Sequence, residues 1–352
     1  MRWNLDPIIT QFSIGPFGPI ELRWYGLLFA TGLLLCAWAG PRYFQIWGVP
    51  KQHAERLTLW IPIGMLLGAH YIHLVFYEWE GLFDFPRFDE DGDFVLGRFF
   101  SLGSGLASHG GALGCILALL IFWWRYGKPL GIAAHRYYDA VMITAIWVFP
   151  FVRLGNFANS EIVGRVTDGP WGVIFERWGY QTARHPVVLY EAALYFAELA
   201  FAVLWFQPRY ARKLRPGATF YFFLMVHFTL RFIAEFAKES QGVDEGWALN
   251  MGHLLSLPIV IGCAYMIFGT KRFNILQPLT AEEKADIEES ARRAAAYEAA
   301  LEAETGGKKS AAVGTTEDDD AKPAAKKSRP TGTKKKKKGG GGGGGKERGV
   351  DA

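Results

Sequence analysis

Two arginines lie inside apolar stretches that are long enough to cross a membrane. Arg153 begins the sequence RLGNFANSEIVGR, which also carries Asn156 and Glu161. Arg231 is followed four residues later by Glu235, a spacing that places both side chains on one face of a helix. A charged side chain at the centre of a bilayer costs at least about 3 kcal/mol, so it needs a partner, a water-filled cavity or a chemical task. For Arg231 and Glu235, a structural salt bridge between the two side chains is as good an explanation as a chemical task.

Histidine and tyrosine side chains occur at the ends of the same apolar stretches. His109 lies in the sequence SHGG, where Gly110 and Gly111 allow another backbone or a substrate to approach closely. The pattern fits a general base and a satisfied interhelical histidine equally well. Tyr25 and His185 lie at the ends of other stretches, where Tyr25 alone would more often be an interfacial anchor.

Metal-binding spacing is weak in this sequence. His70 and His73 lie one turn apart, but no third ligand accompanies them and no HExxH motif is present. Cys36, Cys115 and Cys263 each lie inside an apolar stretch, so they indicate neither a disulfide framework nor a CxxC site. We therefore predict no metal site.

Seven stretches of the chain are apolar enough to span a bilayer as helices, because about 20 residues at a rise of 1.5 Å cross its hydrocarbon. The sequence predicts an all-α polytopic membrane protein with seven transmembrane helices. The predicted spans are residues 24–41, 57–77, 107–124, 137–158, 187–206, 218–236 and 251–270.

The segments between these spans alternate in charge. Ten Lys and Arg residues lie in three of them, 42–56, 125–136 and 207–217. Six lie in the other three, 78–106, 159–186 and 237–250. Because basic loops are retained in the cytoplasm, the sequence predicts an outside N-terminus and a cytoplasmic C-terminus.

This orientation brings the polar residues of separate spans to one leaflet. Arg153, Asn156, Arg231, His109 and Tyr25 all fall near the outer ends of their spans. An anionic phospholipid is the simplest ligand for such a cluster, because planar guanidinium groups bind phosphate through paired donors.

Residues 279–352 form a charged tail. They contain 16 basic and 14 acidic side chains and one aromatic residue, Tyr297. We predict a short helix at 280–304, followed by a low-complexity stretch that buries too little apolar surface to fold. The chain is therefore divided into a membrane domain, residues 1–278, and a disordered cytoplasmic tail. A solvated appendage is the favoured interpretation of the tail over contact with anionic lipid or nucleic acid, and no specific nucleic-acid partner is predicted.

Six segments, in this order, resemble the prolipoprotein diacylglyceryl transferase family. They lie between about residues 15 and 270 and read GPFGPIELRWYG, SHGGALG, RLGNFANSEIVGR, ARHPVVLYEA, RFIAEF and MGHLLSLP. The third is the most specific. Any one segment would be weak evidence, but six in order on a seven-span topology indicate the family.

The resemblance implies an activity. Members transfer the sn-1,2-diacylglyceryl group of phosphatidylglycerol to the lipobox cysteine thiol of a preprolipoprotein, which forms a thioether and releases glycerol phosphate. This is the first step of bacterial lipoprotein maturation, at the inner (cytoplasmic) membrane. Membrane lipid and the lipobox protein are the implied partners, and no metal or organic cofactor is expected.

The resemblance also implies roles for individual residues. His109 would favour the thiolate of the substrate cysteine, since a thiol with a pKa near 8.5 is mostly protonated at neutral pH. Arg153 and Arg231 would stabilise the departing phosphate. The residues expected to shape or support the substrate site are Tyr25, Asn156, Glu161, Gly164, Arg165, His185, His227 and Glu235.

This chain departs from the family pattern at several positions. The residues that differ from those usual there are His70, Ser108, His227, Lys238 and His253. His227 replaces a tyrosine near the predicted site and is therefore an alternative to His109 as the base.

Two other classes of protein compete with this interpretation. A seven-span transporter or channel with an outer-leaflet anion site would be expected to place its site near the midplane between repeated halves, and no internal repeat is present. A receptor or scaffold would give no reason for the arginines buried in the predicted spans.

Overall fold

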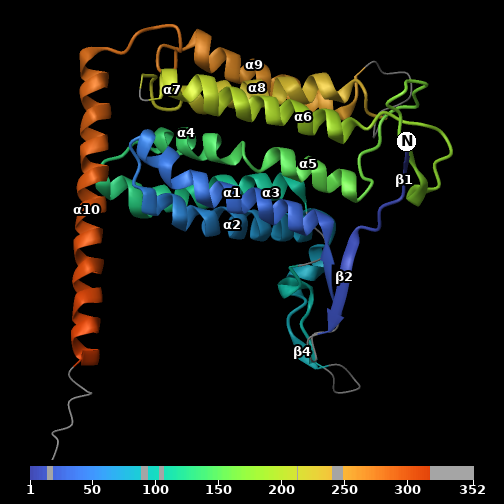
Figure 1. The fold of residues 1–352 in the computed structure, drawn as a ribbon, viewed down its shortest axis with the longest axis horizontal. Coiled ribbons are helices and arrows are strands. Elements are labelled where there is room, and N and C mark those ends of the chain that lie inside the picture. Colours follow the sequence, from blue (N-terminus) through green and yellow to red (C-terminus); the bar gives the residue numbers. More distant parts are fainter. Residues whose placement is uncertain (14–18, 89–93, 103–106, 212, 240–248, 318–352) are drawn as a thin grey trace, which may run out of the picture. The chain divides into compact units, whose positions relative to one another are not determined.

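The computed structural model describes residues 1–13, 19–88, 94–102, 107–211, 213–239 and 249–317 of the chain. The chain divides into two compact units, Met1–Glu302 and Ala303–Ala352. Within the first unit, long helices run alongside one another and short strands lie beyond one end of them (Figure 1).

Three of the described α-helices of the first unit are extended at their C-terminal ends by π-helical turns. The α-helices of the first unit are α1 (Trp24–Ile46), α2 (Lys51–Tyr77), α3 (Ser108–Phe122), α4 (Ala134–Ala145), α5 (Phe149–Ala158), α6 (Val187–Ala200), α7 (Gln207–Tyr210), α8 (Ala218–Glu235) and α9 (Met251–Ala264). The π-helical turns that extend α3, α6 and α9 are η4 (Trp123–Gly127), η7 (Phe201–Phe206) and η8 (Tyr265–Gly269). Helix α10 (Ala281–Glu317) crosses the boundary between the two units.

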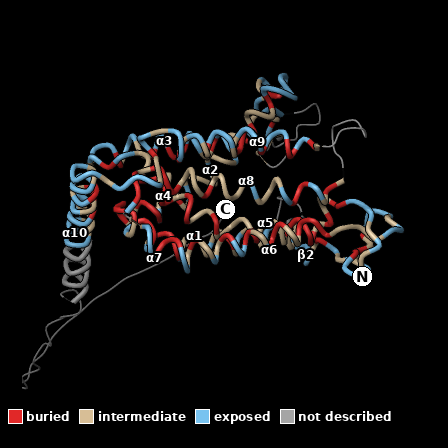
Figure 2. Tube along the Cα trace, turned by 90° about the horizontal axis from the view of Figure 1, so that it is seen from above, coloured by how far each residue is buried: buried red, intermediate tan, exposed pale blue. Residues whose placement is uncertain are grey.

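Large apolar side chains are exposed along these helices. The exposed fraction is 70% for Leu34, 74% for Trp38 and 74% for Leu204. Exposed positions recur along the helices, whereas buried residues gather between them (Figure 2). Such a surface is stable in lipid and not in water. Six helices of the described residues are long and apolar enough to span a membrane, and the bent pair α4–α5 makes seven. The prediction of a mostly helical polytopic membrane protein is confirmed.

The fourth predicted span, 137–158, is two helices. Residues 146–148 separate α4 from α5, and the pair is bent by 40°. Pro150 lies in the first turn of α5, where no N–H is needed. In a continuous helix its ring would clash with the carbonyl group four residues earlier. Helix α5 is a separate short helix that packs against α1 and α6.

Glycines bring α2 and α3 into backbone contact. A Cβ atom added at Gly68 would overlap the carbonyl oxygen of Gly110, and one at Gly114 would overlap that of Gly64. Small residues allow this approach between helices in a membrane, where close packing replaces the hydrophobic effect. The contact fixes the first turn of α3, the turn that contains His109.

Three two-stranded sheets lie outside the spans. Strands β2 (Ile8–Ser13) and β3 (Pro19–Arg23) form an antiparallel hairpin that leads directly into α1, and β4 (Arg87–Phe88) pairs with β5 (Phe94–Val95). Strand β1 (Arg2–Trp3) pairs in parallel with β6 (Ile174–Phe175), and the amino group of Met1 donates a hydrogen bond to the Gly172 carbonyl at 2.9 Å. The N-terminus is thereby tied to the segment between α5 and α6.

The first part of α10 packs against the segments that were predicted to face the cytoplasm. Arg215 Nε lies 2.7 Å from Glu283 Oε1, and this hydrogen bond lowers the pKa of the Glu283 carboxyl. Lys51 contacts two carboxylates of the helix: its backbone N–H lies 2.6 Å from Glu298 Oε1, and its Nζ lies 2.7 Å from Glu302 Oε1. The helix predicted at 280–304 thus begins at Ala281, contacts the first unit and continues to Glu317.

These contacts predict different behaviour for two truncated chains. A chain that ends at residue 302 keeps the ion pairs and the buried Ile287 and Ala294, whereas a chain that ends at residue 278 loses them. We expect the shorter chain to melt several degrees lower in a thermal-unfolding measurement in detergent.

The difference should depend on pH. Because the folded-state pKa of Glu283 is lowered, its contribution is present above the ordinary Glu pKa of about 4.3 and is lost as the pH falls through the lowered value. Equal melting temperatures for the two chains at pH 7 would contradict a stabilising role for this segment.

Candidate functional site

Three helices carry polar side chains on the faces they turn toward one another. We call this set the polar column. It consists of Arg153 and Asn156 on α5, Glu191, Tyr195 and Glu198 on α6, and His227, Arg231 and Glu235 on α8. The α6 and α8 members recur every three or four residues, so each set follows one helical face.

Glu191 is the centre of the charged part of the column. Its side chain is fully buried, and its carboxylate oxygens lie 3.2 Å from Arg153 Nε, 3.0 Å from Lys238 Nζ and 3.8 Å from Arg231 Nη1. A buried carboxylate must be paired, because removing it from water costs several kcal/mol. Glu191 therefore gathers cations from α5, from α8 and from the residues after α8.

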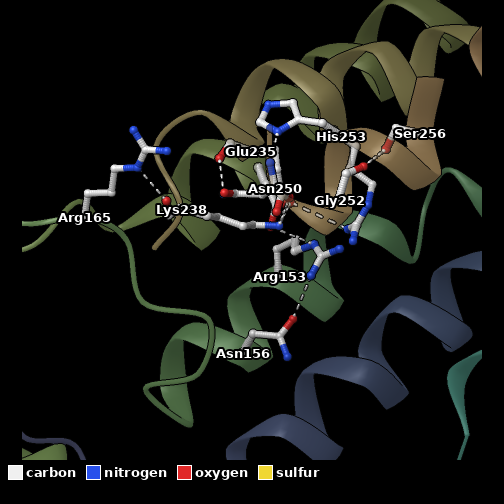
Figure 3. Close-up of polar contacts among 11 residues, drawn as sticks. Arg153, Asn156, Arg165, Glu235, Lys238, Asn250, Gly252, His253 and Ser256 are labelled. Carbon is white, nitrogen blue, oxygen red and sulfur yellow. Dashed lines mark hydrogen bonds and ion pairs between the residues drawn. The ribbon is translucent and has the colours of Figure 1, made fainter. Parts of the chain in front are cut away.

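A second carboxylate completes the charged cluster. Glu235 Oε2 lies 2.9 Å from Lys238 Nζ, so that Lys238 bridges the two carboxylates. The start of α9 supports Glu235, because a Cβ atom added at Gly252 would overlap the Glu235 carboxyl group. Asn250 and His253 close the first turn of α9 with reciprocal capping hydrogen bonds (Figure 3).

The end of α5 forms a chain of hydrogen bonds. Arg153 Nη1 donates to Asn156 Oδ1 at 3.3 Å, and Asn156 Nδ2 donates to Glu161 Oε2 at 2.8 Å. Asn159 Nδ2 donates to the other oxygen of Glu161 at 2.9 Å. Glu161 thereby holds the two asparagine amides in fixed orientations beside Arg153.

The turn that presents Glu161 has an unusual backbone. Ser160 and Ile162, its two neighbours, have φ angles of 58° and 57°. A β-branched residue rarely adopts this left-handed conformation, which costs about 1–3 kcal/mol. Strain of this kind persists where the surrounding contacts require it, as the Glu161 hydrogen bonds do here.

The segment after this turn connects α5, α6 and the end of α8. The Gly164 N–H donates to the His185 carbonyl at 3.1 Å, and Arg165 Nε donates to the Lys238 carbonyl at 2.9 Å. A Cβ atom at Gly164 would overlap the backbone of both His185 and Ala237, so glycine is required by this close approach. Gly164, Arg165 and His185 therefore position Lys238 and the start of α6.

Tyr25 lies at the start of α1 against the backbone of α5. A Cβ atom at Gly155 would overlap the Tyr25 ring. His185 faces a different environment, because its Nδ1 lies 3.1 Å from the Tyr190 hydroxyl and its ring lies near Trp171.

The deeper part of the column is a histidine–carboxylate pair. His227 Nδ1 lies 3.0 Å from Glu198 Oε2. The His227 ring lies between Phe149 and Tyr195, with both ring centroids at 4.4 Å.

His109 lies in the first turn of α3, and its side chain falls outside the described residues. His70 Nε2 lies 3.2 Å from the Phe99 carbonyl oxygen, and His73 Nε2 lies 3.2 Å from the Glu78 carboxylate. The described part of the chain contains no group of three or more His, Cys, Asp and Glu residues arranged to hold a metal ion.

The charged cluster is arranged to bind an anion. Three cations, Arg153, Arg231 and Lys238, face the carboxylates of Glu191 and Glu235. Arg153 and Arg231 keep 15% and 30% of their side-chain surface exposed, so donors beyond those that face Glu191 are available to a ligand. The excess positive charge suits a phosphate group.

Residues 12–269 match the family model described as prolipoprotein diacylglyceryl transferase. The chain belongs to this family. It is therefore a transferase of lipoprotein maturation, as the order of sequence motifs predicted.

Curated members of the family resemble the chain over most of its length. The protein named phosphatidylglycerol–prolipoprotein diacylglyceryl transferase from Tolumonas auensis is 38% identical over 273 residues, which is 76% of this chain and 97% of the relative. Proteins with the same name from Bacteroides fragilis and Vibrio parahaemolyticus are 34% and 32% identical, and the alignments cover 78% and 76% of this chain and 97% and 92% of the relatives. The family match ends before α10 begins.

The structure decides one alternative that the sequence left open and adds residues to the site. Arg231 pairs with Glu191 and Glu235 pairs with Lys238, so these contacts take the place of the Arg231–Glu235 salt bridge that the sequence left open as an alternative. Glu191 and Glu198 were not predicted from the sequence. The signal that identified Arg153, an ionisable side chain inside a predicted span, was present at both positions.

The central role of Glu191 predicts a large effect of its substitution. Glu191→Gln removes one charge and leaves three cations close together, which should destabilise the protein by about 3–5 kcal/mol. Glu78→Gln is the matched control, because Glu78 pairs with Arg98 at a half-exposed position outside the spans, where an ion pair contributes at most about 1 kcal/mol. Thermal unfolding in detergent distinguishes them. Equal melting temperatures would show that Glu191 does not hold the cluster together.

Proposed function

We propose that this chain transfers the sn-1,2-diacylglyceryl group of phosphatidylglycerol to the lipobox cysteine of prolipoproteins. The names of its relatives contain both substrates. The observation that carries the proposal is the position of Arg153 and Arg231 on either side of buried Glu191, with donors left for a phosphate.

The proposed reaction is a displacement at carbon. The cysteine sulfur attacks the carbon of the diacylglyceryl group that bears the phosphate. The bond between this carbon and oxygen breaks, and its electron pair leaves with glycerol phosphate. His109 accepts the thiol proton. Arg153 and Arg231 bind the phosphodiester and stabilise the charge that develops on the departing oxygen, an effect that is strong in a site shielded from water.

The residues around the cluster hold the headgroup. Asn156, Glu161 and Arg165 offer amide, carboxylate and guanidinium groups to the glycerol hydroxyls and phosphate. Gly164 keeps the backbone close enough for this arrangement. The supporting residues are Tyr25, His185, Glu235 and His227.

We place the protein in the bacterial inner membrane with its N-terminus and the headgroup site outside. The catalytic domain comprises residues 1–278, and residues 279–352 form a cytoplasmic tail whose first part docks as α10. The ten basic residues of the three inner segments support this orientation. A transporter with an outer anion site is inconsistent with the family match.

Lysine variants test the phosphate contacts, because Lys keeps the charge but loses the planar pair of donors. Arg153→Lys and Arg231→Lys should each lower the transfer rate about tenfold to a hundredfold, which corresponds to one lost charge-assisted hydrogen bond in the transition state. The assay measures thioether-linked lipid from membranes, labelled phosphatidylglycerol and a lipobox peptide, with protein amounts matched by immunoblot. Arg98→Lys is the control for an arginine outside the spans. Near-normal rates for both site variants would exclude paired phosphate binding at these positions.

Reporter fusions test the orientation. Fusions near residues 90, 170 and 243 should report the outside, and fusions near 50, 130, 212 and 300 should report the cytoplasm. A cytoplasmic signal at residue 90 would rule out the seven-span arrangement.

A further inference from the structure

Glu198 and His227 form a hydrogen-bonded pair deep within the spans of α6 and α8. The Glu198 side chain is fully buried, and 13% of the His227 side chain is exposed. Burial of such a pair costs desolvation energy that a pair of apolar residues would not incur. The pair therefore calls for an explanation other than stability.

The surroundings of His227 connect it to the arginines. Tyr195 stacks on its ring at 4.4 Å, and the Arg153 guanidinium lies 5.8 Å from the centroid of that tyrosine ring. Arg231 lies one turn further along α8 on the same face. The His227 ring lies next to one carboxylate, one tyrosine and apolar rings, one helical turn from Arg231.

The orientation of the ring is fixed by the carboxylate. With Nδ1 directed at Glu198, the other nitrogen, Nε2, is left to exchange a proton with a ligand. Because part of the His227 side chain is exposed, a ligand can reach it. Arg231 follows one turn later on the same face of α8, so the ring lies in the part of the column that leads to the phosphate-binding cations.

We propose, on the basis of the proposed function, that His227 donates a proton from Nε2 to the departing phosphate oxygen and that Glu198 is its positioning residue. The sulfur–carbon bond forms as the carbon–oxygen bond breaks. The thiol proton passes to His109, and the proton of His227 passes to the oxygen that receives the electron pair. Exchange with water then returns a proton to His227 and removes one from His109. The two histidines thus serve opposite ends of one displacement.

The two roles respond differently to changes in the substrates. One analogue of phosphatidylglycerol has sulfur in place of the oxygen between the diacylglyceryl carbon and phosphorus. In this lipid the leaving atom is sulfur, which needs no proton. In a lipobox peptide with selenocysteine, the nucleophile is already ionised at neutral pH and needs no base. Each substitution therefore bypasses one histidine.

We expect His227→Gln to lower the rate with natural substrates about 10²-fold and to recover most of that loss with the bridging-sulfur lipid. His109→Gln should show a loss of similar size that the bridging-sulfur lipid leaves unchanged and the selenocysteine peptide relieves. His135→Gln, at the other end of the α4–α5 pair and packed on Phe273, is the control and should behave as wild type. A His227→Gln loss that is relieved by selenocysteine would instead make His227 the base and overturn the proposal.

Variants of Glu198 separate positioning from folding. Glu198→Gln should lower kcat about tenfold with little change in KM for phosphatidylglycerol, and the bridging-sulfur lipid should again relieve the loss. In the double variant Glu198→Leu, His227→Phe, no buried charge is left unpaired, so the fold should be retained while the rate falls as in His227→Gln. A normal rate for the double variant would show that the pair has only a structural role. No thioether product from the wild-type protein would contradict the proposed function itself.

Discussion

A single fully buried carboxylate, that of Glu191, sets the geometry of the charged cluster. Glu191 draws Arg153, Arg231 and Lys238 to within 3.2, 3.8 and 3.0 Å of its oxygens. In a low-dielectric interior these attractions are strong, and so is the repulsion among the three cations if the carboxylate is absent. A site that binds a phosphate must hold positive charge without spending all of its donors internally. One anion shared among three cations meets both needs, because each arginine faces Glu191 and still presents unused N–H groups.

The backbone around this cluster is shaped to bring the charges together. The break before Pro150 frees α5 from the direction of α4, and the left-handed residues Ser160 and Ile162 return the chain so that Glu161 faces the α5 asparagines. Gly164 and Gly252 are positions where a side chain would displace a neighbour of the site, the first against a backbone and the second against the Glu235 carboxyl. Local strain and missing side chains thus lie next to the ion pairs, where the gain from correct placement is largest.

Much of the fold and part of the site could be predicted from the sequence. Spans of about 20 apolar residues have a strong signal. Arg153, Asn156 and Arg231 were identified because polar residues stand out in such spans, and the family motifs contain the same residues. The partners of Arg231 could not be predicted. Spacing places Glu235 on its helical face, but the buried carboxylate that it faces comes from another helix, and interhelical contacts leave no periodic signal. The bend within 137–158 was also missed, since the residues around the break, 145–152, are all apolar and only Pro150 marks it.

The two carboxylates of α6 restrict how that helix can move. Glu191 and Glu198 are seven residues apart, about two turns and 10 Å along one face, and each is paired with a cationic or imidazole group on α8. Rotation of α6 about its axis would carry both carboxylates into lipid at once. Sliding by one residue would separate both from their partners. In a bilayer, apolar helix faces can shift against one another at little cost. The register of α6 against α8 is therefore set by the two α6 carboxylates, whose fixed spacing matches that of their partners on α8.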